Sequence, residues 1–239
     1  MSNIINPYRF AAAGPPPFSN SYSAEFDGSA SLDDTRRDAP WNVGTGDFSI
    51  SMWCNHNSLV EGGAEMISFR GASAYTSGFA LYMGTESGGT EAKMYLYVGA
   101  ASAGWVAVDS FTTYTWHNVI WVREGATFKV YVDGSIVYNG TSGWGQDISG
   151  GTGYGLHIGA SPYGGGSAFM DGYIDEVAFF DSALSTSDIT AIAGGPNDLS
   201  GYSPVAWYRF EDDTDMGKDS EASYDLTDNG TTQSSEIPS

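Results

Sequence analysis

Residues 168–184 constrain the fold of this chain more than any other stretch, because a turn, a long strand and a helix start follow one another there. Asp171-Gly172 predicts the turn, and residues 173–180, rich in β-branched and aromatic side chains, predict the strand. Asp175 and Glu176 are neighbours inside this strand, so alternation predicts one acid on each face. Because one face of such a strand packs on a core, at least one acid should have a fixed partner.

Short strands separated by loops rich in Gly, Ser and Thr are predicted along most of the chain. Phe48, Ile50, Met52 and Cys54 alternate with polar residues, which predicts an inward and an outward face. Asp133-Gly134 predicts a two-residue type I′ hairpin. Further strands are predicted at 22–26, 66–69, 79–83, 94–98, 105–108, 116–123, 128–132, 136–138 and 156–159. This spacing is typical of an all-β sandwich or jelly roll of antiparallel sheets.

One short helix is predicted at residues 185–193, between a Ser185 or Thr186 cap and the Gly-Gly-Pro that follows. Residues 201–230 contain two more strand-like stretches. They are either the start of a truncated second repeat or strands added to the same sandwich. We favour the second interpretation, since half a sandwich cannot bury its apolar face. Residues 231–239 are a polar tail.

The first 20 residues are predicted to be an extended arm, ahead of a sandwich at residues 21–200. A triple proline favours a stiff spacer without hydrogen bonds of its own. The arm is apolar for a solvated tail, and it is either disordered or docked on a partner or a neighbouring copy. The residues predicted to dock are Ile4, Ile5, Tyr8, Arg9 and Phe10.

Charge and cysteine content exclude several functions. The chain has 9 basic and 29 acidic residues, a formal charge of −20, so its surface repels phosphate backbones and anionic membranes. The only cysteine, Cys54, lies on an apolar face and is expected to be a buried, inert thiol. The first residues lack the features of a signal peptide, so we expect the protein to be made in the cytoplasm.

Five motifs resemble the laminin-G-like domains of the concanavalin-A-like lectin and glucanase superfamily, in that family's order. They are Phe26-Asp27-Gly28, residues 46–53, Trp116-His117-Asn118-Val119, residues 130–134 and Gly172-Tyr173-Ile174-Asp175-Glu176-Val177. The resemblance implies a jelly roll of two antiparallel sheets with a short C-terminal helix. It says little of activity, because one fold hosts many functions.

The resemblance also implies a structural calcium ion, held by Asp27 and Asp175 with backbone carbonyls. In the alternative interpretation, Asp27 caps its own turn and Asp175 accepts backbone N–H groups. A weaker prediction is a glycan site on Gly-rich loops, where aromatic residues otherwise cover the rim of the sandwich. Its residues are Trp105, Trp144, Gln146, Tyr154 and Tyr163.

Catalysis is not expected. The glucanases of the superfamily carry a Glu-x-Asp-x-x-Glu motif on one strand face, and this sequence has none. The arm, the proline spacer and the domain together resemble structural proteins of tailed bacteriophages. That resemblance implies a non-enzymatic virion protein on a capsid or tail fibre, with virion proteins or copies of itself as partners and cell-surface glycans as ligands. The alternative is a carbohydrate-binding lectin with a structural calcium ion.

Overall fold

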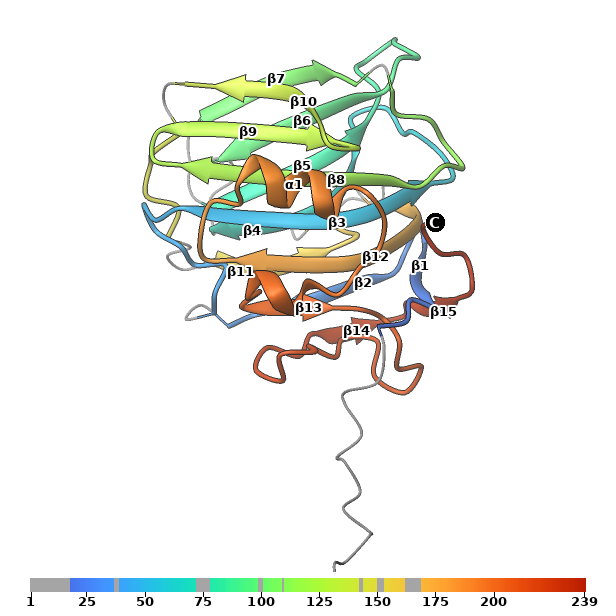
Figure 1. The fold of residues 1–239 in the computed structure, drawn as a ribbon. Coiled ribbons are helices and arrows are strands. Elements are labelled where there is room, and N and C mark those ends of the chain that lie inside the picture. Colours follow the sequence, from blue (N-terminus) through green and yellow to red (C-terminus); the bar gives the residue numbers. More distant parts are fainter. Residues whose placement is uncertain are drawn as a thin grey trace, which may run out of the picture.

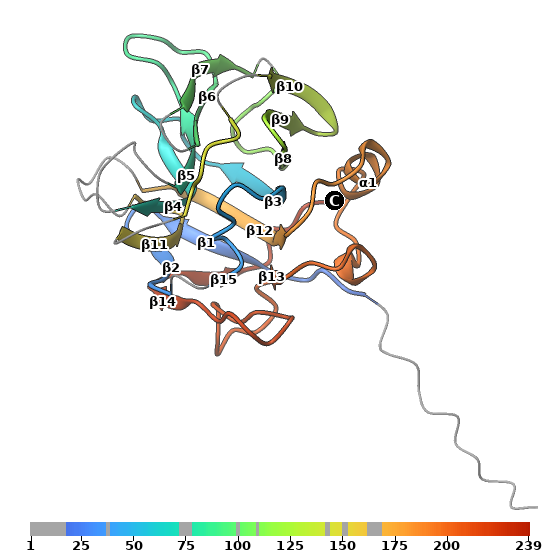
Figure 2. The ribbon, with the colours of Figure 1, turned by 90° about the vertical axis from the view of Figure 1, so that its left-hand side faces the viewer.

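Two antiparallel β-sheets packed face to face form the protein (Figures 1 and 2). The computed structural model describes residues 18–36, 39–71, 78–98, 101–108, 110–141, 144–149, 153–161 and 169–239, with only the backbone of residues 70–71, 98, 101–105 and 153–154. The predicted all-β jelly-roll sandwich is confirmed.

Fifteen strands are assigned in the described part of the chain. The first eight are β1 (Ser23–Asp27), β2 (Ser31–Asp34), β3 (Phe48–His56), β4 (Ala64–Gly71), β5 (Gly78–Gly84), β6 (Lys93–Val98), β7 (Ala101–Ala107) and β8 (His117–Glu124). The others are β9 (Thr127–Val132), β10 (Ser135–Gly140), β11 (Gly153–Ile158), β12 (Asp171–Phe180), β13 (Ala206–Tyr208), β14 (Thr227–Asn229) and β15 (Thr232–Ser234). The helices are α1 (Thr186–Ile192) and the 3-10 helix η1 (Leu199–Tyr202).

The eight-stranded sheet, here sheet A, has the order β10-β9-β8-β3-β12-β1-β15, with β13 paired to β12. The seven-stranded sheet B has the order β14-β2-β11-β4-β5-β6-β7. The predicted hairpin joins β9 to β10, and Asp133 and Gly134 both have the positive φ values, +49° and +74°, that a type I′ turn requires.

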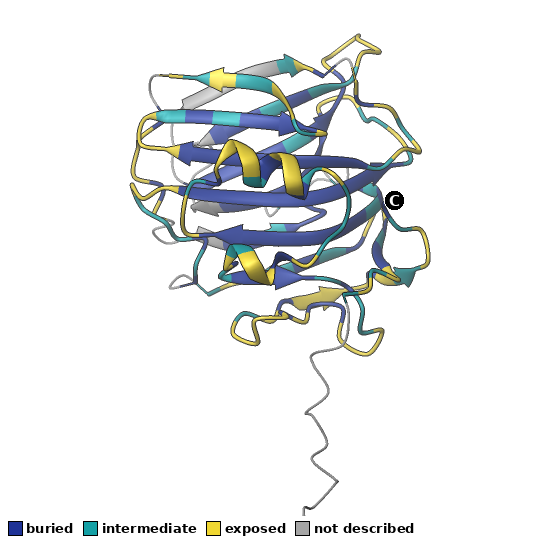
Figure 3. Ribbon diagram, in the orientation of Figure 1, coloured by how far each residue is buried: buried dark blue, intermediate teal, exposed yellow. Residues whose placement is uncertain are grey.

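The main core lies between the two sheets. The inward side chains of β3 are the predicted set Phe48, Ile50, Met52 and Cys54, and all are buried. Cys54 is a free, buried thiol whose pKa burial raises, as expected of an inert cysteine. Figure 3 shows that the central strands of sheet A are buried along almost their whole length.

A second, smaller core lies on the outer face of sheet A, where α1 covers the strands (Figure 1). Ile189 and Ile192 of α1 pack there against Ile120 and Phe180. Ser185 is the N-cap, and it forms a capping box with Asp188. The predicted helix is confirmed, and it makes this face of sheet A the covered one. No helix in the described part of the chain is long and apolar enough to cross a membrane.

The C-terminal strand segment lies on this sandwich. β13 and β14 of residues 201–230 pair with β12 of sheet A and β2 of sheet B, and β15, which lies in the predicted polar tail at residues 231–239, pairs with β1 of sheet A. The segment therefore adds strands to both sheets at the side of the sandwich where β1 and β2 lie, as Figure 1 shows below β12.

Candidate functional site

The outer face of sheet B carries a row of mostly polar and aromatic side chains across five strands. In register, Asp33 of β2 lies opposite His157 of β11, His157 opposite Ser68 of β4, Ser68 opposite Ala80 of β5, and Ala80 opposite Tyr97 of β6. Their neighbours along each strand belong to the main core, so these side chains point out of the sandwich.

A parallel row follows two residues further along β5 and β6, and three residues along β4, which has a bulge between Glu65 and Ile67. Glu65 of β4 lies opposite Tyr82 of β5, and Tyr82 lies opposite Tyr95 of β6. The rings of Tyr82 and Tyr95 are half-buried and meet edge to face, with centroids 6.1 Å apart. Aromatic rings with hydroxyl groups, beside a carboxylate and an imidazole, supply both apolar faces and hydrogen-bonding groups for a polar ligand.

The adjacent acids of β12 lie on one side of sheet A rather than on opposite faces, so that prediction was wrong. Asp175 lies opposite Trp53 and Ala178 opposite Ser51, which leaves one extra residue on β12. The extra residue is a β-bulge, in which Glu176 has a φ of +50°. Because of the bulge, the next side chain after Ile174 that points into the main core is Val177. Both acids between them are turned toward the outer side of the sheet.

Both acids are buried and have partners. Asn20 donates its Nδ2 hydrogen bond to Asp175 Oδ2 at 2.8 Å, and the Glu176 N–H donates to Asp175 Oδ1 at 2.8 Å. Trp207 Nε1 donates to Glu176 Oε2 at 2.5 Å, and Arg209 Nε lies 3.4 Å from Glu176 Oε1. The expectation of a fixed partner is confirmed for both acids.

Burial nevertheless favours the neutral form of each acid. It raises the pKa of Asp175 well above its usual range, with the neighbouring Glu176 charge adding to the rise. It raises the pKa of Glu176 to about 7, against the opposing effects of Arg209 and the Trp207 hydrogen bond. These partners fix both side chains at the bulge.

Asp27 and Asp175 are not brought together. In the β1–β12 pairing, Asp27 lies opposite Asp171 and Ala24 lies opposite Ile174. The position on β1 that faces Asp175 is therefore four residues from Asp27, which is about 13 Å along the strand. Asp27 instead caps its own turn, where it accepts bonds from Ser29 and Ala30, and the Ser29 bonds lower its pKa. One calcium ion cannot bridge this pair.

No group of three or more His, Cys, Asp or Glu side chains among the described residues is placed to hold a metal ion. Calcium binding by other groups, with the backbone carbonyls expected from the sequence, stays a prediction.

The structure separates the predicted glycan residues. Trp144 is only 3% exposed and packs between Phe128 and Tyr138, so its rings belong to the core. Gln146 lies in the same loop, where its backbone carbonyl accepts a bond from Arg123. Trp105 lies opposite Tyr95 on β7, at the end of the Glu65 row. The side chains of Trp105 and Tyr154, and all of Tyr163, lie outside the described parts.

The predicted docking residues Ile4, Ile5, Tyr8, Arg9 and Phe10 also lie outside the described residues, but the chain that follows them is held firmly. Phe18 stacks on Trp207 with centroids 6.2 Å apart, and the Arg209 guanidinium lies over both rings. Glu211 accepts the backbone N–H groups of Ser21 and Tyr22. Residues 18–22 therefore have a fixed position beside β13, on the covered side of sheet A (Figure 2).

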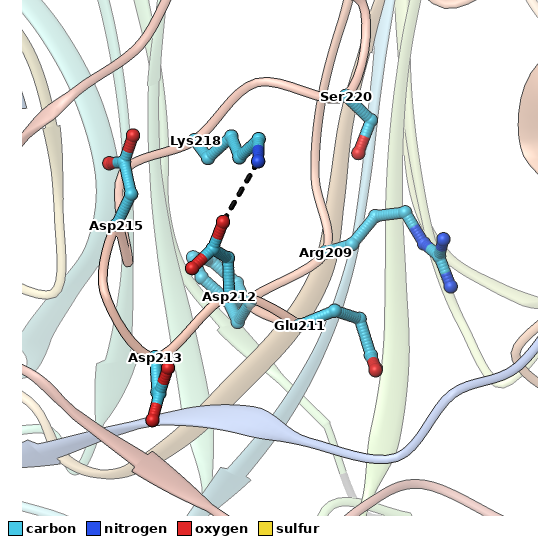
Figure 4. A pocket seen from close by; sticks show the side chains of 8 residues that line it. Arg209, Glu211, Asp212, Asp213, Asp215, Lys218 and Ser220 are labelled. Atoms are coloured by element: carbon cyan, nitrogen blue, oxygen red, sulfur yellow. Dashed lines mark hydrogen bonds and ion pairs between the residues drawn. The ribbon is translucent and has the colours of Figure 1, made fainter.

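A surface pocket of about 340 Å³ lies beside this segment, lined by Arg209 and by acids of the loop after β13. Figure 4 shows Asp212 and Lys218 turned toward one another, at 2.8 Å. That contact and two bonds from Thr214 lower the pKa of Asp212 to about 2. Arg209 and Glu211 hold Glu176 and residues 21–22. These contacts give the pocket walls a structural role.

Sequence reasoning missed the outward residues of sheet B. The signal for Tyr82, Tyr95 and Tyr97 was present, because each alternates with apolar residues inside a predicted strand. The cross-strand alignment that gathers them with Glu65 and His157 was not visible, because it depends on the register of strands far apart in the chain.

The fold defines the chain as a two-sheet jelly roll. The sequence profile of the concanavalin A-like lectin/glucanases superfamily matches residues 27–190, and the chain belongs to this family. No curated protein matches the chain by sequence.

Solved structures resemble the chain in fold, at low sequence identity. A protein from Bacteroides ovatus to which carbohydrate binding is assigned has a TM-score of 0.67 and 16% identity, over 93% of this chain and 62% of its own length. The carbohydrate-binding module CBM40 of the Ruminococcus gnavus IT-sialidase gives 0.56 and 14%, over 72% of this chain and 97% of the module. A pentraxin from Limulus polyphemus gives 0.54 and 18%, over 73% and 82%.

Proposed function

We propose that this protein is a non-enzymatic glycan-binding domain whose ligand lies on the outer face of sheet B. The observation that carries the proposal is the accessible part of the outward rows, where Tyr82, Tyr95 and His157 are half-buried, while Glu65, Ser68, Ala80 and Tyr97 of the same rows are buried. α1 packs on the outer face of sheet A and leaves this face of sheet B uncovered by helices of the described chain.

Carbohydrates suit this chemistry. Their C–H faces pack on aromatic rings, and their hydroxyl groups pair with tyrosine hydroxyls, carboxylates and imidazoles. The fold neighbours support the same ligand class, since two of them are described by carbohydrate binding and the R. gnavus module has a structure with α2,3-sialyllactose.

A glycan array with the full chain tests the proposal, and the double variant Tyr82→Ala/Tyr95→Ala tests the site. We expect binding to at least one glycan class, and at least about tenfold weaker binding by the variant, since each stacked ring contributes roughly 1 kcal/mol. Tyr114→Ala is the matched control, because Tyr114 is 73% exposed on a loop before β8. Unchanged binding by the double variant, or no glycan bound at all, would refute the proposal.

The same array, repeated with a metal chelator, tests the predicted calcium ion. Loss of binding or of thermal stability on chelation supports a calcium site formed by groups other than the Asp27 and Asp175 pair. Release of reducing ends from any bound glycan would contradict the non-enzymatic assignment.

A second part of the proposal is that residues 1–17 anchor the domain to a virion, on a capsid or tail fibre, or to copies of itself. The supporting observation is that residues 18–22 are fixed on the covered side of sheet A, while the glycan rows lie on the outer face of sheet B (Figure 2). The binding face would then point away from the assembly.

Deletion of residues 1–17 tests the anchoring role. We expect the truncated chain to keep its thermal stability and its glycan binding while it fails to join the assembly. Normal incorporation of the truncated chain would overturn the anchoring role and leave glycan binding untouched.

A further inference from the structure

An aromatic patch lies on the outer face of sheet A, at the end that α1 does not cover. Glu25 of β1 lies opposite Tyr173 of β12, and Tyr173 lies opposite Asn55 of β3. All three point outward, because their strand neighbours are in the main core. The ring of Trp116 lies beside Tyr173, with centroids 6.3 Å apart and planes at 42°. We name Glu25, Asn55, Trp116 and Tyr173 the acceptor patch.

Hydrogen-bond acceptors without donors gather at this patch. Asn55 is 6% exposed, and no described residue donates to its Oδ1. The amide oxygens of Asn20 and Asn118, on the neighbouring row with Asp175 and Trp53, also have no donor among the described residues. Buried amide oxygens are normally paired, so the unpaired Asn55 Oδ1 inside the patch marks a place that suits a ligand rich in donors.

The charge around the patch is negative. Burial and the nearby carboxylates of Glu25, Glu236 and Asp171 raise the pKa of Tyr173. The Lys and Arg side chains in the described parts of the chain have partners elsewhere: Arg36 with Asp34, Lys93 with Glu86, Arg123 with backbone carbonyls, Lys129 with Glu124, Arg209 with Glu176 and Lys218 with Asp212. A ligand that complements the negative charge of the patch is therefore a cation that belongs to another molecule.

We propose that the acceptor patch binds an arginine side chain of a partner polypeptide. A guanidinium is planar, always charged and carries five N–H donors, so it stacks on Trp116 or Tyr173 while it donates to Glu25 and Asn55 Oδ1. The chain already uses this arrangement at Arg209, which lies over Phe18 and Trp207. The unpaired indole N–H of Trp116 suits a peptide carbonyl beside the arginine, which a free polyamine lacks.

The test is a titration of the full chain with the peptide acetyl-Gly-Arg-Gly-amide, followed by NMR through the indole N–H signal of Trp116. The neutral isostere acetyl-Gly-citrulline-Gly-amide and the polyamine spermidine are the comparison ligands. We expect the arginine peptide to shift the Trp116 signal with saturation, and citrulline to bind at least about tenfold more weakly, because the charge and the stacking both favour arginine.

Two variants locate the site. Glu25→Gln keeps the shape and should weaken the arginine peptide about threefold, and Trp116→Ala should weaken it about tenfold, read from shifts of neighbouring amides. Glu61→Gln, at an exposed acid outside the patch, is the control and should change nothing. Equal binding of arginine and citrulline, spermidine binding as well as the peptide, or full affinity of Trp116→Ala would each overturn the proposal.

Discussion

Two places along the β3–β12 strand pair, the central bulge and one end, bury ionisable groups in opposite ways. At the bulge, Asp175 and Glu176 are buried with Asn20, Trp207 and Arg209 as partners. At one end of the pair, His56 lies opposite Gly172, fully buried, and neither ring nitrogen has a partner among the described residues. Its ring instead meets Phe111 edge to face, with centroids 5.6 Å apart.

Burial favours the neutral form of both His56 and Glu176, but the two groups reduce stability in opposite directions of pH change. The pKa of His56 falls to about 4, chiefly through burial, with the nearby charges of Asp171 and His117 acting in opposite directions. The pKa of Glu176 rises to about 7. Because folding lowers the pKa of His56, the free energy of unfolding decreases as pH falls from 6.5 to 4. Because folding raises the pKa of Glu176, the free energy of unfolding also decreases as pH rises from 4.5 to 7. Maximum stability is therefore expected at mildly acidic pH.

The largest effect is expected from removal of the charged partner at the bulge. Arg209→Met at pH 8 leaves an ionised Glu176 buried without its counter-ion, and it should lower the free energy of unfolding by about 4 kcal/mol. The loss should shrink at pH 5, where Glu176 holds its proton. Urea unfolding measures both values. Lys218→Met is the matched control, because its ion pair with Asp212 is exposed and should contribute far less to stability.

Replacement of Glu176 should remove the decrease in the free energy of unfolding that is expected as pH rises. In the unmodified protein, the shift of the Glu176 pKa corresponds to about 3 kcal/mol lost as pH rises from 4.5 to 7. Glu176→Gln keeps the hydrogen-bond acceptor for Trp207 without the charge. Urea unfolding across this pH range should give a flatter curve for the variant. If the variant's stability curve runs parallel to that of the unmodified protein, Glu176 does not titrate in this pH range.

The histidine end should show the mirror image. The lowered pKa of His56 corresponds to about 3 kcal/mol lost as pH falls from 6.5 to 4. His56→Phe keeps an aromatic ring against Phe111 and should remove this acid sensitivity. His157→Gln is the comparison variant, since His157 is only half-buried on sheet B. The interpretation fails if His56→Phe loses as much stability between these pH values as the unmodified chain.

The smallest effect is expected at the edge of the bulge. Asn20→Ala removes one hydrogen bond to Asp175, which keeps the bond from the Glu176 N–H, so the loss should be about 1 kcal/mol. Hydrogen exchange should show faster exchange of the Ser21 and Tyr22 amides, because Asn20 helps to hold this segment. Unchanged protection there would show that Glu211 and the Phe18 stack fix residues 18–22 alone.

The sequence by itself determined the elements. Alternation in β3, the Asp133-Gly134 hairpin, the capped helix after residue 184 and the family motifs all depend on residues close together in the chain, so local patterns predicted them. Buried Cys54 followed from the same alternation. His117, in one of the family motifs, accepts from the Thr112 N–H at 3.1 Å and bonds Asp133 at 2.7 Å.

Only the tertiary structure decided the sites. One extra residue in β12 turned Asp175 and Glu176 to the same side, and the register of β1 placed Asp27 about 13 Å from the proposed metal partner. Trp144 became core because Phe128 and Tyr138 enclose it. The rows of sheet B and the acceptor patch join residues from strands far apart in sequence. Pairing register sets those neighbours, and one residue of slip changes them all.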